Sequence, residues 1–194
     1  MITSCEMRTL LSPQDAERGL RRLAGEIIER HRGVERLLLV GIRRGGVAVA
    51  DWLARELAKQ SGVEIPVGSV DISLYRDDAA EALPNPRIGP TFIPLELKGY
   101  HVVLCDDVLY TGRTIRAAID AIFDYGRPAS IELAVIIDRD GRELPIQADF
   151  LVKRAPTPKS ERVDVITTNE GFHAVAVSQN APSTPPPAVT ESSP

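Results

Sequence analysis

The chain has 194 residues, of which 43% are hydrophobic and 26% are charged, as in ordinary soluble globular proteins. This length favours a single domain with a sizeable core. The net charge of −4 excludes a grossly basic nucleic-acid binder, although a local basic face is compatible with that total. No apolar run reaches the length of a membrane span, the N-terminus lacks a signal-peptide pattern, and Cys5 and Cys105 give neither a disulfide framework nor metal-ligand spacing. We therefore expect a cytoplasmic protein with no membrane partner.

The first predicted element is an amphipathic helix. Ser12 has the character of an N-cap, Pro13 stands at the first helical position, and apolar residues recur at helical spacing through about His31. The opposite face carries mixed charges, including Arg18, Arg21 and Arg22. A solvated face is the simpler interpretation of such a pattern, and a binding surface is the alternative.

A short strand and a second helix follow, joined by a loop with two arginines and two glycines. Residues 37–42 form a continuous apolar run, typical of a strand buried on both faces. Arg43, Arg44, Gly45 and Gly46 interrupt the run before a helical pattern begins. Guanidinium groups and backbone amides at the carboxyl end of a strand suit a diphosphate. A tight turn with exposed arginines fits the sequence equally well.

A third strand and a long insertion come next. Residues 67–74 alternate in polarity and are rich in β-branched side chains, which predicts a strand. Residues 79–98 contain four prolines and no sustained period. Long irregular insertions in compact domains are usually functional or mobile. A lid over an active site is one interpretation and an ordinary surface excursion is the other; the position between two strands favours the lid.

The central segment, residues 102–114, joins an apolar run of strand type to two adjacent aspartates, a short loop and a helix. Gly112 permits unusual backbone angles, so the loop can present several N–H groups to one anion. Asp106 and Asp107 are expected at the carboxyl end of the strand, where open α/β sheets bind ligands. Neighbouring strand residues point to opposite faces, which argues against an acid–base pair of glycosidase type. We expect a phosphate site beside carboxylates, with a strand-end cap as the alternative.

The rest of the chain completes an α/β pattern. The predicted elements are a helix through Phe123, a strand at 131–137, a short strand at 150–152, a basic loop at 153–159 and a hairpin of 163–168 with 172–177. We predict a single α/β domain over residues 10–177, with a mainly parallel twisted sheet flanked by helices, a mobile lid insertion and a C-terminal hairpin. Residues 1–9 are expected to be a flexible N-terminus, and residues 178–194, rich in Pro, Ser and Thr, a disordered tail.

Together these segments suit a sugar that carries a 5′-phosphate and a leaving diphosphate. The loop after Asp107 would hold the monophosphate, and the aspartates would accept hydrogen bonds from ribose hydroxyls and stabilise an oxocarbenium ion. Residues 43–45, Arg76 and a magnesium ion would take the diphosphate. A Walker P-loop would need a lysine after the last glycine, and a dinucleotide fingerprint three spaced glycines; neither pattern is present. No protein side chain is assigned as a metal ligand.

Residues 102–114 resemble the phosphoribosyl-diphosphate (PRPP) signature of the type I phosphoribosyltransferases. Segments 71–78, 106–114, 126–128 and 142–146 are similar to one member family, the bifunctional pyrimidine-operon regulators and uracil phosphoribosyltransferases (PyrR-like). The resemblance runs from about Leu10 to Val177. It implies a transferase that joins uracil to PRPP and gives UMP and diphosphate, with Mg²⁺ chelated by PRPP.

The resemblance also assigns roles to residues. The implied catalytic residues are Asp106, Asp107 and Arg76. The implied PRPP-binding residues are Val102, Val103, Leu104, Cys105, Val108, Leu109, Tyr110, Thr111, Gly112, Arg113 and Thr114, together with Arg43, Arg44 and Gly45. The implied base pocket includes Ile137, Asp138 and Arg139. The diphosphate loop departs from the family pattern, because the arginine stands one place earlier than usual.

The family's second activity is binding of pyrimidine-operon leader mRNA, when UMP or UTP is bound, to favour transcription termination. The resemblance implies a basic RNA face built on a homodimer or a higher oligomer. Its residues would include Arg18, Arg21, Arg22, Arg142, Lys153 and Lys159. Departures from the family pattern fall mainly on this side, at Gly25, Gln147 and Val152. An RNA-binding nucleotide sensor with little catalysis, or a phosphoribosyltransferase for another base such as hypoxanthine or guanine, are the alternatives.

Overall fold

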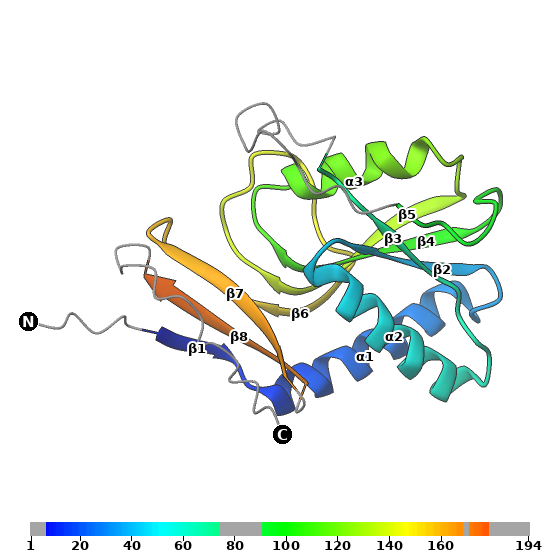
Figure 1. Ribbon diagram of the computed structural model, residues 1–194. Coiled ribbons are helices and arrows are strands. Elements are labelled where there is room, and N and C mark those ends of the chain that lie inside the picture. Colours follow the sequence, from blue (N-terminus) through cyan, green and yellow to red (C-terminus); the bar gives the residue numbers. More distant parts are fainter. Residues whose placement is uncertain (1–6, 74–90, 169–170, 179–194) are drawn as a thin grey trace, which may run out of the picture.

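The computed structural model describes residues 7–73, 91–168 and 171–178, which form two β-sheets and three helices (Figure 1). The larger sheet has five parallel strands in the order β3-β2-β4-β5-β6. Its strands are β2 (Leu37–Ile42), β3 (Val67–Val70), β4 (His101–Leu109), β5 (Ser130–Asp138) and β6 (Phe150–Arg154). The helices are α1 (Pro13–His31), α2 (Gly45–Ser61) and α3 (Arg113–Phe123). Because β4 lies at the centre of the sheet, the segment that follows β4 is flanked by the segments that follow β2 and β5.

The second sheet is antiparallel and packs beside the first. It has the order β1-β8-β7, with β1 (Met7–Leu11), β7 (Glu161–Thr168) and β8 (Gly171–Ser178). Strands β7 and β8 confirm the predicted C-terminal hairpin. Residues 7–9, expected in a flexible N-terminus, form part of β1 instead and pair with β8. This pairing joins the two ends of the described chain. The local pattern of a five-residue strand does not predict which distant strand it pairs with.

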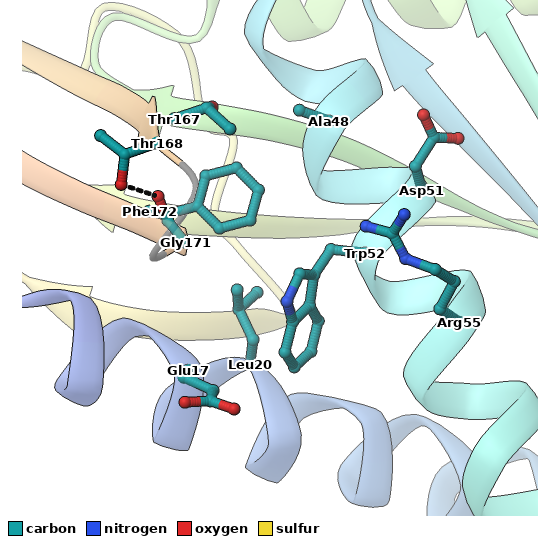
Figure 2. Close-up of a pocket in the computed structure, with 10 residues that line it drawn as sticks. All are labelled: Glu17, Leu20, Ala48, Asp51, Trp52, Arg55, Thr167, Thr168, Gly171 and Phe172. Atoms are coloured by element: carbon teal, nitrogen blue, oxygen red, sulfur yellow. Dashed lines mark hydrogen bonds between the residues drawn. The ribbon is translucent and has the colours of Figure 1, made fainter.

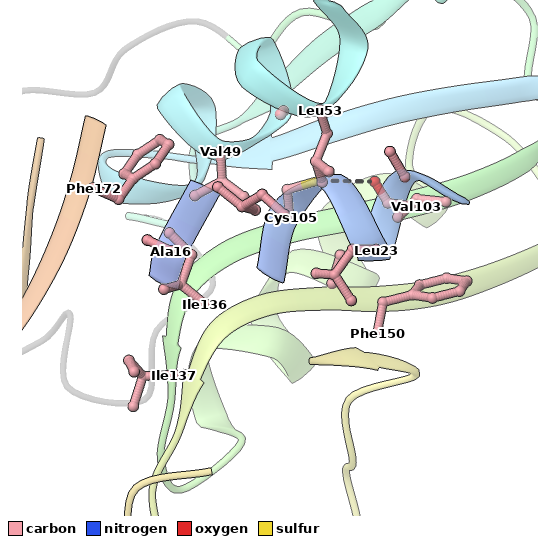
Figure 3. Packing of buried hydrophobic residues seen from close by; sticks show 14 of the residues in the cluster. Ala16, Leu23, Val49, Leu53, Val103, Cys105, Ile136, Ile137, Phe150 and Phe172 are labelled. Carbon is pink, nitrogen blue, oxygen red and sulfur yellow. Dashed lines mark hydrogen bonds between the residues drawn. The ribbon is translucent and has the colours of Figure 1, made fainter. Parts of the chain in front are cut away.

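Two apolar clusters cover the two faces of the parallel sheet. Side chains of α1, α2 and the hairpin pack on one face, where Val103 and Cys105 of β4 are fully buried (Figure 3). Helix α3 packs on the other face, against Val102 and Leu104. The side chains of β4 alternate between the two clusters, as expected for a strand buried on both faces. Burial raises the pKa of the Cys105 thiol, and repulsion from Asp106 adds to the rise, so Cys105 is a packed core residue.

The strand predicted at 67–74 is shorter in the structure. Strand β3 ends at Val70, and Asp71 then turns the chain by accepting hydrogen bonds from the backbone N–H of Ser73 (2.8 Å) and from its hydroxyl (2.5 Å). A local side-chain acceptor has therefore displaced strand pairing. Of the predicted lid at 79–98, residues 79–90 lie outside the described residues, and so do residues 74–78, which include Arg76. Phe92, near its end, pairs with Ser69 through two 2.8 Å backbone hydrogen bonds.

Within the described ranges, no helix is long and apolar enough to cross a membrane. Ser178, expected in the disordered tail, ends β8 instead, and the rest of that predicted tail, residues 179–194, lies outside the described ranges, as do Asn169 and Glu170 of the predicted hairpin turn.

Candidate active site

The carboxyl ends of β2, β4 and β5 meet at one edge of the parallel sheet. The strand register places Gly41 beside Cys105, and Leu109 beside Asp138. The segments that follow these strands therefore converge there. These are the arginine-glycine loop after β2, the aspartates and loop of β4, and the Asp138–Arg139 segment of β5. Open α/β sheets bind ligands at such an edge.

The two aspartates of β4 have different surroundings. Asp106 is only 6% exposed, whereas Asp107 is half-buried. The backbone N–H of Asp107 donates to Oδ1 of Asp106 (3.0 Å), and the N–H of Val108 donates to Oδ1 of Asp107 (2.8 Å). Burial raises the pKa of Asp106, and the neighbouring Asp107 carboxylate raises it further. The site thus holds one buried carboxyl group and one that a ligand can reach.

The N-terminus of α2 lies directly against the end of β4. A Cβ atom on Gly45 would lie 2.2 Å from Oδ2 of Asp107, and one on Gly46 would lie 2.0 Å from the carbonyl oxygen of Cys105. Both glycines are therefore required for close contact between helix and strand, which the sequence interpretation as a diphosphate loop did not foresee. Arg44, at the N-cap position, makes no side-chain capping hydrogen bond, so the first amides of α2 are available to an anion beside Asp107.

Helix α3 follows the same aspartates in the sequence, after a short loop that begins at Tyr110. Gly112, at its N-cap position, has φ of 93° and provides no capping side chain. Thr111 Oγ1 accepts a hydrogen bond from the N–H of Arg113 (3.3 Å). The loop is shorter than predicted, because β4 continues through Val108 and Leu109. The part that can wrap a phosphate is therefore residues 110–114.

The structure separates the predicted PRPP-binding residues into two kinds. The side chains of Val102, Val103, Leu104 and Cys105 are completely buried in the core, and that of Leu109 nearly so. These residues position the site and cannot touch a ligand through their side chains. The residues near the ligand edge are Arg43, Arg44, Gly45, Asp106, Asp107, Tyr110, Thr111, Gly112, Arg113 and Thr114. Arg43 and Arg44 are exposed, and the Arg43 guanidinium donates to Ser69 Oγ (3.4 Å).

The predicted base-pocket segment is largely buried. Ile137 belongs to the core, and Asp138 and Arg139 are each 5% exposed. The Arg139 guanidinium donates to the carbonyl oxygens of Glu161 (3.0 Å) and Pro158 (3.1 Å) and lies 4.1 Å above the Tyr110 ring. Its two terminal nitrogens are therefore engaged within the protein. A contact from this residue to a base would come from its backbone or from Nε.

The sequence did not indicate any role for Thr157. Among the described residues, Thr157 Oγ1 and Arg139 Nε are the buried side-chain polar atoms without a hydrogen-bond partner. Buried polar atoms are seldom left unpaired, so each such atom calls for an explanation. Thr157 adjoins Pro158, whose carbonyl binds Arg139. Only the folded structure shows that these two atoms are buried and unpaired.

The six residues predicted for an RNA face differ in their availability. Arg18 is 81% exposed, and Lys159 is also exposed. Arg21 pairs with Glu17 (2.7 Å), while Arg22 pairs with Glu26 (2.6 Å) and donates to the carbonyl of Leu151 (2.8 Å). Lys153 donates to the carbonyl of Leu10 (2.8 Å). Arg142 lies apart from these, with its guanidinium turned into the protein.

The site contains little that would hold a metal ion by itself. Over the part of the chain that is described, no group of three or more metal-binding side chains occurs. The two adjacent carboxylates are nevertheless hard oxygen donors, as Mg²⁺ prefers. Mg²⁺ usually binds through one or two carboxylates together with substrate phosphates and water. The residues present therefore fit a magnesium ion that arrives with its substrate.

A separate cavity of about 450 Å³ lies between α1, α2 and the end of the β7–β8 hairpin that contains Thr168 and Gly171 (Figure 2). Trp52 and Phe172 line it with Asp51, Arg55 and Thr168. None of the residues predicted for the site lines this cavity in the described structure. The chemistry suggested by the sequence therefore lies at the sheet edge, where the two helix N-termini and the aspartates meet.

Comparison with known proteins identifies the class of protein to which this chain belongs. The family model described as phosphoribosyl transferase domain matches residues 7–172. The hypoxanthine phosphoribosyltransferase of Trypanosoma cruzi has the same fold, with a TM-score of 0.66 at 22% identity, over 88% of this chain and 96% of that one. The fold is that of a phosphoribosyltransferase, with the parallel sheet and flanking helices that the sequence predicted.

Relatives with higher sequence identity show to which family within this class the chain belongs. The bifunctional protein PyrR of Chloroflexus aurantiacus is 53% identical over 171 residues, which cover 88% of this chain and 94% of the relative. The bifunctional protein PyrR of Geobacter sp. strain M21 is 51% identical over 156 residues, covering 80% and 88%. The chain belongs to the bifunctional PyrR family, as its resemblance to that family implied.

Proposed function

We propose that this protein is a uracil phosphoribosyltransferase that converts uracil and PRPP to UMP and diphosphate, and that it also regulates pyrimidine-operon expression. One observation carries the catalytic part. The N-cap residues of α2 and α3, Arg44 and Gly112, make no side-chain capping hydrogen bond, and the N-terminus of α2 lies against Asp107 while α3 begins shortly after β4 ends. PRPP is anionic at both ends of a ribose, so this arrangement matches its charge distribution.

The reaction then follows from the positions of these groups. Residues 110–114 and the first amides of α3 hold the 5′-phosphate, and Asp107 accepts hydrogen bonds from the ribose hydroxyls. The first amides of α2, with Arg43 and Arg44, hold the diphosphate. As the bond from C1 to the diphosphate oxygen breaks, the nearby carboxylates stabilise the positive charge on the ribose. Uracil N1 forms the new bond to C1 and loses its proton, and diphosphate departs with the electron pair.

Magnesium enters this proposal as part of the substrate. Mg²⁺ bound to PRPP would neutralise charge on the leaving diphosphate. Asp107, the member of the pair that a ligand can reach, would supply an oxygen ligand to it. Arg76 is proposed to reach the diphosphate as well, on the strength of the family resemblance alone.

The preference for uracil rests on the family, while the structure contributes two candidate contacts. Thr157 Oγ1 and Arg139 Nε are buried and unpaired beside the segment assigned to the base pocket. A hydroxyl and an N–H suit the alternating carbonyl and N–H groups on the edge of a pyrimidine. The runner-up acceptor is a purine base such as hypoxanthine or guanine.

A panel of bases tests the catalytic proposal. The protein is incubated with PRPP and Mg²⁺ together with uracil, hypoxanthine, guanine or orotate, and diphosphate release is measured. We expect turnover with uracil and little with the purines. Turnover with a purine alone would replace the acceptor and keep the class, whereas no turnover by the folded protein with any base would refute the enzymatic proposal.

The regulatory part of the proposal is supported by membership of a family whose named members are bifunctional, and by the exposed cations Arg18 and Lys159. We propose binding of leader mRNA in the presence of UMP or UTP, in the cytoplasm, where nascent mRNA and PRPP occur together. Titration of leader RNA with and without UMP decides between this and a sensor with little catalysis. Binding that ignores both UMP and RNA sequence would contradict the regulatory role.

We further propose that residues 7–178, which include all of β1 and β8, fold as one unit, that the ends outside this range are not needed for catalysis, and that the protein works as a homodimer or higher homo-oligomer. Truncation to that unit, with turnover and sedimentation measured on both proteins, tests all three statements. Loss of turnover on truncation would show that the ends contribute, and a catalytically active monomer would refute the assembly.

A further inference from the structure

Arg142 makes an unusual number of contacts within the protein. Its Nε–H donates to the carbonyl of Ile146 (2.8 Å), and Nη1 donates to the carbonyls of Tyr110 (2.5 Å) and Arg139 (3.0 Å) and more distantly of Leu109 (3.4 Å). Its Nη2 pairs with the carboxylate of Asp138. A guanidinium has five N–H groups, and these contacts engage most of them. Arg142 therefore has little capacity left to bind RNA phosphates directly.

The acceptors of Arg142 belong to two different parts of the site. Leu109 ends β4 and Tyr110 begins the loop that leads to the 5′-phosphate position. Asp138 and Arg139 belong to the segment assigned to the base. The side chain of Arg142 thus spans the gap between the element proposed to hold the phosphate and the element proposed to hold the base.

The surrounding packing reinforces this bridge. Backbone N–H groups of Glu143 (3.0 Å) and Leu144 (3.2 Å) donate to the carbonyl of Thr111. A Cβ atom on Gly112 would lie within 3.4 Å of side-chain atoms of Leu144 and Ile146. Residues 142–146 therefore pack along residues 110–114, which we call the phosphate loop. Among them, Arg142 is the residue that also reaches the base segment.

We propose that Arg142 is a positioning residue that fixes the phosphate loop relative to the base segment, so that a nucleotide can occupy both at once. This inference rests on the proposed function, since it concerns the same site. A rigid fork that contacts several carbonyls can hold two segments in a single arrangement, which a flexible ammonium group cannot do. UMP spans both segments, whereas ribose 5-phosphate occupies only the phosphate side.

The test compares the affinities of UMP and ribose 5-phosphate by calorimetry in wild type and Arg142→Gln. Loss of charge-assisted hydrogen bonds should lower UMP affinity at least about tenfold and ribose 5-phosphate affinity by no more than roughly threefold. We also expect kcat to fall more than the affinity for PRPP. An equal change in both affinities, or no change in either, would overturn the proposal.

Two further variants separate positioning from folding and from charge. Arg142→Lys keeps the positive charge beside Asp138 but loses the fork, and should still show most of the loss of UMP affinity; it also serves if the Gln variant does not fold. Arg154→Gln is the matched control, because Arg154 lies 3.6 Å from the same Asp138 carboxylate, is 68% exposed and makes no hydrogen bond or ion pair with the phosphate loop among the described residues. It should behave as wild type. If uracil proves to be the wrong acceptor, the affinity ratio is taken with the nucleoside monophosphate that the wild type binds, so the two proposals fail separately.

Discussion

Gly45 and Asp107 are so close that a Cβ atom on the glycine would lie 2.2 Å from the aspartate Oδ2. The obstacle is the end of a side chain, so Gly45→Ala should rotate the Asp107 carboxylate without unfolding the domain. We expect turnover to fall at least about tenfold, because small misplacements of a reacting group are costly. Steady-state diphosphate release and thermal unfolding on the same preparation check this.

Two other glycines give the controls for that experiment. Gly25→Ala on α1 should leave turnover unchanged and raise stability by about 0.5–1 kcal/mol, since only Gln60 Oε1 lies within 4 Å, at 3.9 Å. Gly46→Ala should instead destabilise the fold, because its Cβ atom would meet the backbone carbonyl of Cys105. Unchanged turnover in Gly45→Ala would mean that the position of the Asp107 carboxylate is not critical.

Replacement of both aspartates should abolish most of the activity. Asp106→Asn combined with Asp107→Asn removes the negative charge near the developing ribose cation, and we expect a loss of about 10²-fold to 10³-fold or more in kcat. Circular dichroism should show a folded domain. Asp120→Asn is the control, because Asp120 is exposed on α3 and pairs with Arg116 (2.8 Å). A double variant that retains substantial turnover would exclude the assigned role of the pair.

The single change Asp106→Asn should stabilise the ligand-free protein at neutral pH. Burial raises the pKa of Asp106, so the folded state binds its proton more tightly than the unfolded state does. Ionised Asp106 therefore lowers stability by the full amount above its folded pKa, and this cost shrinks as the pH falls from that value to the pKa of the unfolded chain, below which it is absent. Asn keeps the Oδ1 acceptor for the Asp107 N–H without the charge.

Thermal unfolding between about pH 8 and pH 4 measures this effect. The melting temperature of Asp106→Asn should exceed that of wild type at the upper end, and the difference should shrink toward the lower end. A variant that is less stable than wild type throughout would show that the carboxylate is stabilised in the fold rather than strained by burial.

The basic residues should divide into two groups in RNA binding. Arg18→Gln and Lys159→Gln should weaken leader RNA binding and reduce its salt dependence, with little change in melting temperature, because both side chains are exposed. Arg22→Gln and Lys153→Gln should lower the melting temperature, because both residues donate to backbone carbonyls far away in the chain. Electrophoretic titration at several salt concentrations, with calorimetry, separates the groups. Unaltered RNA affinity in the first pair would locate the RNA face elsewhere.

Most of the fold could be predicted from the sequence because its signals are local. Ser12 caps α1 as predicted, accepting from the N–H of Asp15 (3.2 Å), and the helix ends at His31. The apolar runs gave the central strands, since strands buried on both faces need continuous apolar residues. The pattern around Asp106, Asp107 and Gly112 likewise located a strand end, a loop and a helix start within thirteen residues.

The tertiary structure decided what depends on contacts between distant segments. The sequence could not show that Gly45 faces Asp107, that β1 pairs with β8, or that Thr157 is buried without a partner. It also could not distinguish Arg142, whose guanidinium binds the carbonyls of the phosphate loop, from Arg18, which is exposed to solvent. Residue type and spacing determine local conformation and the chemical groups available. Packing between strands and helices that lie far apart in the chain determines whether a charged side chain faces the protein interior or the solvent.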